Sequence, residues 1–107
     1  MVALKGARTF VATPAGESWC HDASQIGLAT SGSGDVLAGI VAGLLSRGAT
    51  LAQAAVWGVF LHAAAGRALA RTHGPLGYLA SQLPGAVPAA MHRHVRAPAP
   101  ARARRKA

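Results

Sequence analysis

The feature that most constrains the fold is a run of small residues placed directly before a helix-forming segment. Residues 31–34 read Ser-Gly-Ser-Gly. After them, apolar residues recur at the three- and four-residue intervals typical of a helix, at Val36, Leu37, Ile40, Val41, Leu44 and Leu45. Glycines let a backbone come close to a ligand, and the first N–H groups of a helix have no partners within it. The pattern therefore predicts an anion site, most naturally for a phosphate, where the helix begins.

Asp35 follows this glycine loop, at the start of the predicted helix. An exposed aspartate there is stabilised by the helix dipole by roughly 0.3–1 kcal/mol. The residues alone leave two interpretations open: Asp35 is a helix N-cap beside an ordinary turn, or it serves a bound ligand. The loop is not a Walker loop, because no Lys-Ser/Thr pair follows it. It is not the dinucleotide fingerprint either, because no G-x-G-x-x-G follows a strand.

Short strands are predicted before the loop. Residues 2–4 are apolar, and residues 9–13 are β-branched and aromatic. Residues 17–20 are predicted to return antiparallel after a turn at 14–16, which makes a hairpin. Two strands do not form a stable sheet on their own. We therefore expect an α/β fold in which these are edge strands of a larger unit, closed by helices.

Two further helices are predicted after the first. Thr50 and Gln53 form a capping-box signature, so a second helix is expected from there to about Arg71. A third is expected from about residue 82, and Pro88 in its interior is expected to kink or shorten it.

Five residues within these elements are expected to serve packing between elements. Gly39 and Gly43 lie four apart on one helix face, where another element could approach closely. His62 lies on an otherwise apolar face and is interpreted as a core or interface histidine with its hydrogen bonds satisfied, rather than a catalytic one. Trp19 and Trp57 are interpreted as packing residues.

The net charge of +8 resides mostly in a tail. Residues 91–107 hold six of the eleven basic residues and no acidic one, so we expect a folded part over 1–94 and a disordered basic tail over 95–107. No recognition motif accompanies the charge, so nucleic acid is not expected as a partner. No apolar run reaches membrane-span length, so no membrane is expected either. Cys20 is the only cysteine, which fits a cytoplasmic protein.

The segment 27–40, Gly-Leu-Ala-Thr-Ser-Gly-Ser-Gly-Asp-Val-Leu-Ala-Gly-Ile, resembles the signature of the ADP/ATP-dependent NAD(P)H-hydrate dehydratases of the ribokinase-like superfamily. Residues 4–9 resemble the second nucleotide-contacting motif of that family. The resemblance covers about residues 2–92, and further similar segments lie at 58–62, 65–66 and 77–81. Related vitamin-type kinases share the small-Gly-x-Gly-acid core, so a small-molecule kinase remains an alternative.

The resemblance implies a fold and a reaction. The chain would be the C-terminal part of a ribokinase-like three-layer fold. The reaction would repair hydrated NADH or NADPH: a nucleotide phosphoryl group activates the hydroxyl of the hydrate, and loss of phosphate restores the nicotinamide. The resemblance implies ADP or ATP as co-substrate, with the choice open, Mg²⁺ carried with the nucleotide, and assembly into homo-oligomers.

The resemblance also implies roles for individual residues. Asp35 would contact the hydrate and act as base toward its hydroxyl. The adenine nucleotide would be contacted by Lys5, Gly6, Ala7, Arg8, Thr9 and Gly34. Gln25 and Ile26 stand where the family usually has Asn-Pro. The family domain is far longer, and its N-terminal portion carries much of the hydrate site. We therefore expect a piece of the domain that is inactive by itself, with a remnant that only binds adenine nucleotide as the alternative.

Overall fold

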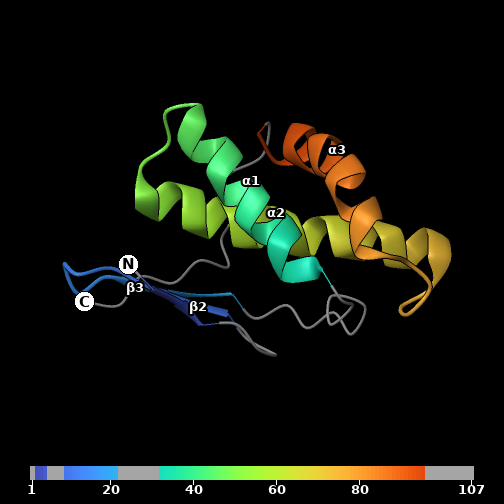
Figure 1. Ribbon diagram of the computed structural model, residues 1–107, viewed down its shortest axis with the longest axis horizontal. Helices are drawn as coiled ribbons and strands as arrows, with labels where there is room; N and C mark the ends of the chain where they lie inside the picture. The colour runs from blue at the N-terminus through green and yellow to red at the C-terminus, as the bar shows by residue number, and fades with distance from the viewer. Residues whose placement is uncertain (1, 5–8, 22–31, 96–107) are drawn as a thin grey trace.

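The protein is represented by a computed structural model, which describes residues 2–4, 9–21 and 32–95. Three short strands precede the helices in chain order (Figure 1). The elements are β1 (Val2–Leu4), β2 (Thr9–Ala12), β3 (Ser18–His21), α1 (Ser33–Ser46), α2 (Leu51–His73), the short 3-10 helix η2 (Ala80–Gln82) and α3 (Leu83–Val95). The predicted order of short strands followed by helices is confirmed. Most of the predicted loop between them, residues 22–31, lies outside the described residues.

The strands form one antiparallel sheet in the order β1-β2-β3. The predicted hairpin is confirmed, since β2 and β3 pair around a turn that contains Gly16 at φ 90°. Val11 and Trp19 pair across the two strands, and both pack against the helices. Val11 is 2% exposed whereas its neighbour Phe10 is 43% exposed, so one face of β2 is buried and the other is open in the described structure.

Helix α2 is the centre of the molecule. Every residue from Gly58 to Gly66 is buried, a run that is expected only of a helix covered on several sides. Both α1 and α3 pack against α2, and the sheet lies on the other side of it (Figure 1). Each of the three apolar clusters of the core contains residues of α2, among them Val59, Leu61 and Ala65. The capping box predicted for its start is present, with Thr50 Oγ1 accepting from the Gln53 N–H at 3.1 Å.

Helices α1 and α2 approach closely at Gly58, not at the two glycines named from the sequence. A Cβ added at Gly58 would lie 2.7 Å from Cγ2 of Val41 on α1. Gly39 and Gly43 are exposed, and a Cβ on either would meet nothing within 4 Å in the described structure. The prediction of a close approach at Gly39 and Gly43 is therefore wrong for the described residues, because that face of α1 points away from α2.

Helix α3 differs from expectation at two places. It runs on past Pro88 to Val95 and is not shortened. Pro88 and Pro84 are both exposed, so the backbone carbonyl that loses its partner can be hydrated. His94 is half-buried: its Nδ1 donates to the Ala90 carbonyl at 2.8 Å, and its ring meets Phe60 edge-on at 4.7 Å. His94 is thus part of the packing, although it lies within the basic stretch 91–107.

A second basic group lies within the folded part. Burial, together with the nearby charges of Arg71 on α2 and Arg93 on α3, lowers the pKa of Arg67 on α2. The tail beyond Val95 lies outside the described residues.

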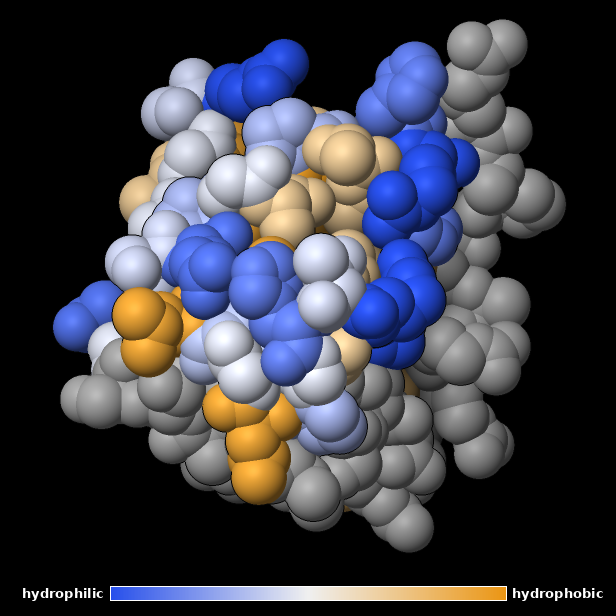
Figure 2. All heavy atoms as spheres, turned by 90° about the vertical axis from the view of Figure 1, so that its right-hand side faces the viewer, coloured by the Kyte–Doolittle hydropathy of each residue, from blue (hydrophilic) through white to orange (hydrophobic). Residues whose placement is uncertain are grey.

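Figure 2 views the molecule from the right-hand side of Figure 1 and shows hydrophobic groups that are separated from one another by hydrophilic ones. Among the described helices, none is long and apolar enough to cross a membrane.

Two glycine-to-alanine substitutions should change stability in opposite directions. Gly58→Ala forces a methyl group against the stiff Val41 side chain and should destabilise the chain by about 1–3 kcal/mol. Gly39→Ala adds a methyl group in open space within a helix and should stabilise it by up to about 1 kcal/mol. Urea denaturation of both variants measures the free energy of unfolding. An equal increase in the free energy of unfolding of both variants would contradict the close contact between α1 and α2 at Gly58.

Candidate functional site

The start of α1 presents backbone N–H groups that have no partner inside the helix. Gly32 is the N-cap, at φ 90° and ψ −6°, a left-handed conformation that favours glycine. The first N–H that donates into the helix is that of Val36, to the Gly32 carbonyl at 3.2 Å. The N–H groups of Ser33, Gly34 and Asp35 precede it and lack intrahelical acceptors. The predicted helix is confirmed, but it begins at Ser33, two residues before Asp35, so Ser33 and Gly34 belong to the helix and not to the loop. The backbone at this helix start has the arrangement that binds anions.

Asp35 is the third residue of this helix and not its N-cap. Of the two interpretations left open by the sequence, the simple N-cap is therefore wrong. The Asp35 side chain is exposed, and its carboxylate makes no hydrogen bond or ion pair with any residue that the structure describes. Gly34 is exposed beside it. A carboxylate in this place is free to meet a ligand that docks at the helix start.

Ser33, between these residues and the N-cap, points inward instead. Its side chain is 3% exposed, and its Oγ lies 3.0 Å from Nε2 of His62 on α2. The same nitrogen lies 3.1 Å from the Ser33 carbonyl oxygen. His62 is 4% exposed, so the interpretation as a buried histidine with its hydrogen bonds satisfied is confirmed. No sequence pattern pointed to its partner, Ser33, which lies 29 residues away.

The segment before α3, which contains Tyr78 and Ala80, packs beside the start of α1. A Cβ added at Gly32 would lie 3.4 Å from the Cβ of Ala80 in η2. Tyr78, just before η2, is 3% exposed and packs in the same apolar cluster as Ala80 and the half-buried Val36. Its hydroxyl has no hydrogen-bond partner among the described residues. Residues 77–81 were named as a segment similar to the family, but no physical role was assigned to them. In the structure, Ala80 of this segment packs against Gly32, the N-cap of α1.

The second predicted nucleotide motif is only partly described. Lys5, Gly6, Ala7 and Arg8 lie outside the described residues. Thr9 is the first residue of β2, where it is half-buried and pairs with His21 of β3. The described residues therefore do not test whether this motif lies close to the start of α1.

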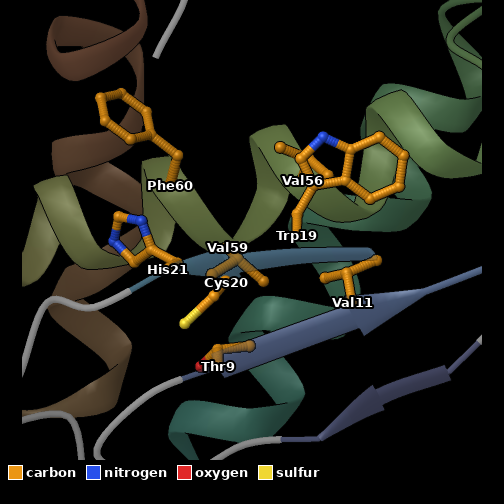
Figure 3. Close-up of a pocket in the computed structure, with 8 residues that line it drawn as sticks. All are labelled: Thr9, Val11, Trp19, Cys20, His21, Val56, Val59 and Phe60. Atoms are coloured by element: carbon orange, nitrogen blue, oxygen red, sulfur yellow. The ribbon is translucent and has the colours of Figure 1, made fainter. Parts of the chain in front are cut away.

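Thr9 lines a small cavity between the sheet and α2 (Figure 3). His21 and Phe60 lie at one end of this cavity, with their rings edge-on at 5.9 Å, and Trp19 lies at the other. The cavity measures about 10 Å³, barely the space of one water molecule. It is a packing gap and is too small to hold a nucleotide.

Metal ligands are scarce in the described part of the chain. No group of three or more His, Cys, Asp or Glu side chains is placed there to hold a metal ion. Asp35 would be a single carboxylate, whereas Mg²⁺ keeps near-octahedral oxygen ligation. The described residues alone do not form a magnesium site, so no step is assigned to the metal.

Comparison with known proteins decides the family. The family model described as NAD(P)H-hydrate dehydratase matches residues 1–89, which include the strands, α1, α2 and the start of α3. The chain belongs to the NAD(P)H-hydrate dehydratase family. The match covers most of the chain and includes both motifs from which the resemblance was inferred.

Individual relatives agree with this assignment. The chain is 50% identical over 93 residues to the ADP-dependent (S)-NAD(P)H-hydrate dehydratase of Xanthomonas campestris, which covers 87% of this chain and 32% of that protein. It is 42% identical over 83 residues to the enzyme of the same name from Neisseria meningitidis, covering 77% of this chain and 28% of that protein. It is 46% identical over 80 residues to the bifunctional NAD(P)H-hydrate repair enzyme of Moorella thermoacetica, and the match covers 75% of this chain and 15% of that protein.

The chain thus spans about a third or less of the length of these relatives. No solved structure matches it.

The burial of Tyr78 next to the α1 start should be visible in its titration. Burial disfavours the phenolate and raises the pKa of Tyr78 above 10.0. The folded chain therefore keeps its proton at a pH where the unfolded chain has lost it. The stability that comes from burying the neutral Tyr78 side chain is fully present below about pH 10 and is lost as the pH rises through the pKa of the folded state. Tyr78 is the only tyrosine, so near-ultraviolet absorbance follows it directly. The urea-unfolded chain is the control, and titration at the same pH in both states would contradict the burial.

Proposed function

We propose that this chain supplies the nucleotide-phosphate site and the catalytic base for the nucleotide-dependent dehydration of NAD(P)H hydrate. The observation that supports this most directly is the α1 start, where the N–H groups of Ser33, Gly34 and Asp35, which have no acceptor within the helix, lie beside an exposed carboxylate. The family match and the name of the Xanthomonas relative give the substrate class and favour ADP over ATP as phosphoryl donor.

The N–H groups at the start of α1 would bind the phosphate that is transferred. Phosphoryl transfer depends mainly on positioning and on stabilising charge, and helix N-terminal N–H groups supply both. Lys5 and Arg8 are proposed to add positive charge, and Thr9, Gly6 and Ala7 to contact the nucleotide; these roles rest on the resemblance alone.

Asp35 would take the proton of the hydrate hydroxyl as that oxygen attacks the terminal phosphorus of ADP. The bond from phosphorus to the AMP oxygen breaks, and AMP leaves. Inorganic phosphate then departs with the former hydroxyl oxygen, a ring proton is lost, and the double bond of NAD(P)H is restored. The carboxylate is suited to the first step because it is exposed and unengaged among the described residues, so a substrate can reach it.

The alternative is a chain that binds adenine nucleotide without turning over the hydrate. The share of the Xanthomonas enzyme that it covers, 32%, supports this alternative, because catalysis there draws on a much longer protein. In a ribokinase-like three-layer fold, the described sheet and helices would be one portion of the whole. Homo-oligomeric assembly and a cytoplasmic location are proposed from the resemblance only.

A chimera separates the two functions. In it, this chain replaces the matching 93 residues of the Xanthomonas enzyme, and recovery of NADH absorbance from NADH hydrate with ADP reports turnover. We expect the chimera to be active and the isolated chain to bind ADP without turnover. Asp35→Asn in the chimera should lower turnover by about 10²–10⁴-fold, the usual contribution of a general base, while ADP affinity in calorimetry is retained.

Glu17→Gln is the charge-matched control, since Glu17 lies in the turn between β2 and β3. It should leave turnover unchanged. Full activity of Asp35→Asn would remove Asp35 from the mechanism, and turnover by the isolated chain would refute the need for the longer protein.

A further inference from the structure

The contact between His62 and Ser33 is a buried polar link between two helices that otherwise meet through apolar side chains. His62 and Ser33 are 4% and 3% exposed, and both polar distances, 3.0 and 3.1 Å, end on the same nitrogen, Nε2. One joins Nε2 to the Ser33 hydroxyl and the other joins it to the Ser33 carbonyl. A histidine nitrogen that contacts both the side chain and the main chain of one residue fixes that residue in place.

The carbonyl decides which form of the ring is present. A carbonyl oxygen can only accept, so Nε2 at 3.1 Å must carry a proton and donate. If Nε2 were unprotonated, two lone pairs would face each other in a buried place, which is costly. The single N–H is therefore shared between the Ser33 carbonyl and Oγ. Because Oγ accepts from His62, the hydroxyl proton of Ser33 is directed away from the ring.

Ser33 is the residue through which this link reaches the candidate site. It follows Gly32, whose glycine backbone is the least restricted of any residue, and it precedes Gly34 and Asp35. No side-chain hydrogen bond caps α1. Among the described residues, the polar contact that holds the start of α1 comes from His62.

We propose that His62 is a positioning residue, which holds the start of α1 in the conformation that binds the nucleotide phosphate and presents Asp35. This inference rests on the proposed function for its consequence, although the positioning itself can be measured without a ligand. His62 is buried against Ser33 and acts through it, whereas Asp35 is exposed. When the link is lost, only a fraction of molecules keep the competent conformation, and the apparent affinity falls by that fraction.

The variants separate the hydrogen bond from packing. Glutamine can place an amide N–H close to the position of Nε2, so His62→Gln keeps the donor. His62→Leu fills much of the same volume without a donor. Leu61→Val is the control, because Leu61 is the adjacent buried residue and packs in the cluster with Leu44, at the far end of α1.

The ligand-free test uses nuclear magnetic resonance on the 107-residue chain. The ring nitrogen shifts should show Nε2 protonated. His62→Leu should speed hydrogen exchange at the Val36 N–H, which closes the first turn of α1, by at least about tenfold, as for a local opening. The Ala54 N–H, which closes the first turn of α2 on Thr50, is the internal control and should change much less. His62→Gln should restore slow exchange at Val36, and Leu61→Val should affect both amides alike.

The ligand test is titration with ADP in a calorimeter. His62→Leu should weaken ADP binding by about tenfold, in line with a competent fraction near one tenth, and His62→Gln should recover most of it. If the unsubstituted chain does not bind ADP, the proposed function fails while the exchange data still test the positioning. An unprotonated Nε2, equal exchange of Val36 and Ala54 in His62→Leu, or a glutamine variant as impaired as the leucine variant would each overturn the inference.

Discussion

The burial of α2 on several sides is the constraint on which the rest of the structure depends. Its alanines and glycine let three neighbours come close: the sheet through Val11, α1 through Val41 at Gly58, and α3 through Ala90. A domain of this size buries a modest share of its surface, so a central helix that contacts every other layer is an efficient way to form a core. The position of the α1 start relative to the sheet is set through this helix.

Apolar contacts between small residues bring helices together but resist sliding only weakly, because many offsets bury similar area. A buried polar pair behaves differently, since each group loses solvation and must find its partner. His62 and Ser33 form such a pair between α1 and α2. In any other register of α1 on α2, both would be left buried without each other. The apolar packing therefore brings the helices together, and the hydrogen bond favours the register that places Ser33 against His62.

Local chemistry made much of this predictable. The hairpin, the capping box at Thr50 and the helix near the glycine run depend on neighbours in sequence. The first two are confirmed, and the helix is present but begins at Ser33, inside the glycine run. What failed depends on distant contacts. The spacing of Gly39 and Gly43 marks a helix face but does not tell which face meets α2. The sequence could identify His62 as buried, yet its partner is set by packing. The roles of Asp35 and of residues 5–9 came from the resemblance and remain predictions.

The alternation of buried and exposed side chains in the first turn of α1 has a geometric reason. Successive helix residues are turned by about 100°, so residues two apart face nearly opposite sides. Ser33 and Asp35 are such a pair, and the structure has Ser33 buried against His62 while Asp35 is exposed. One side chain can thus anchor the first turn while the other stays exposed. Gly34 stands between them with no side chain to cover the backbone N–H groups. A small residue that faces inward, a glycine and an acid that faces outward therefore form one unit, in which the buried anchor and the exposed carboxylate are separated by less than one helical turn.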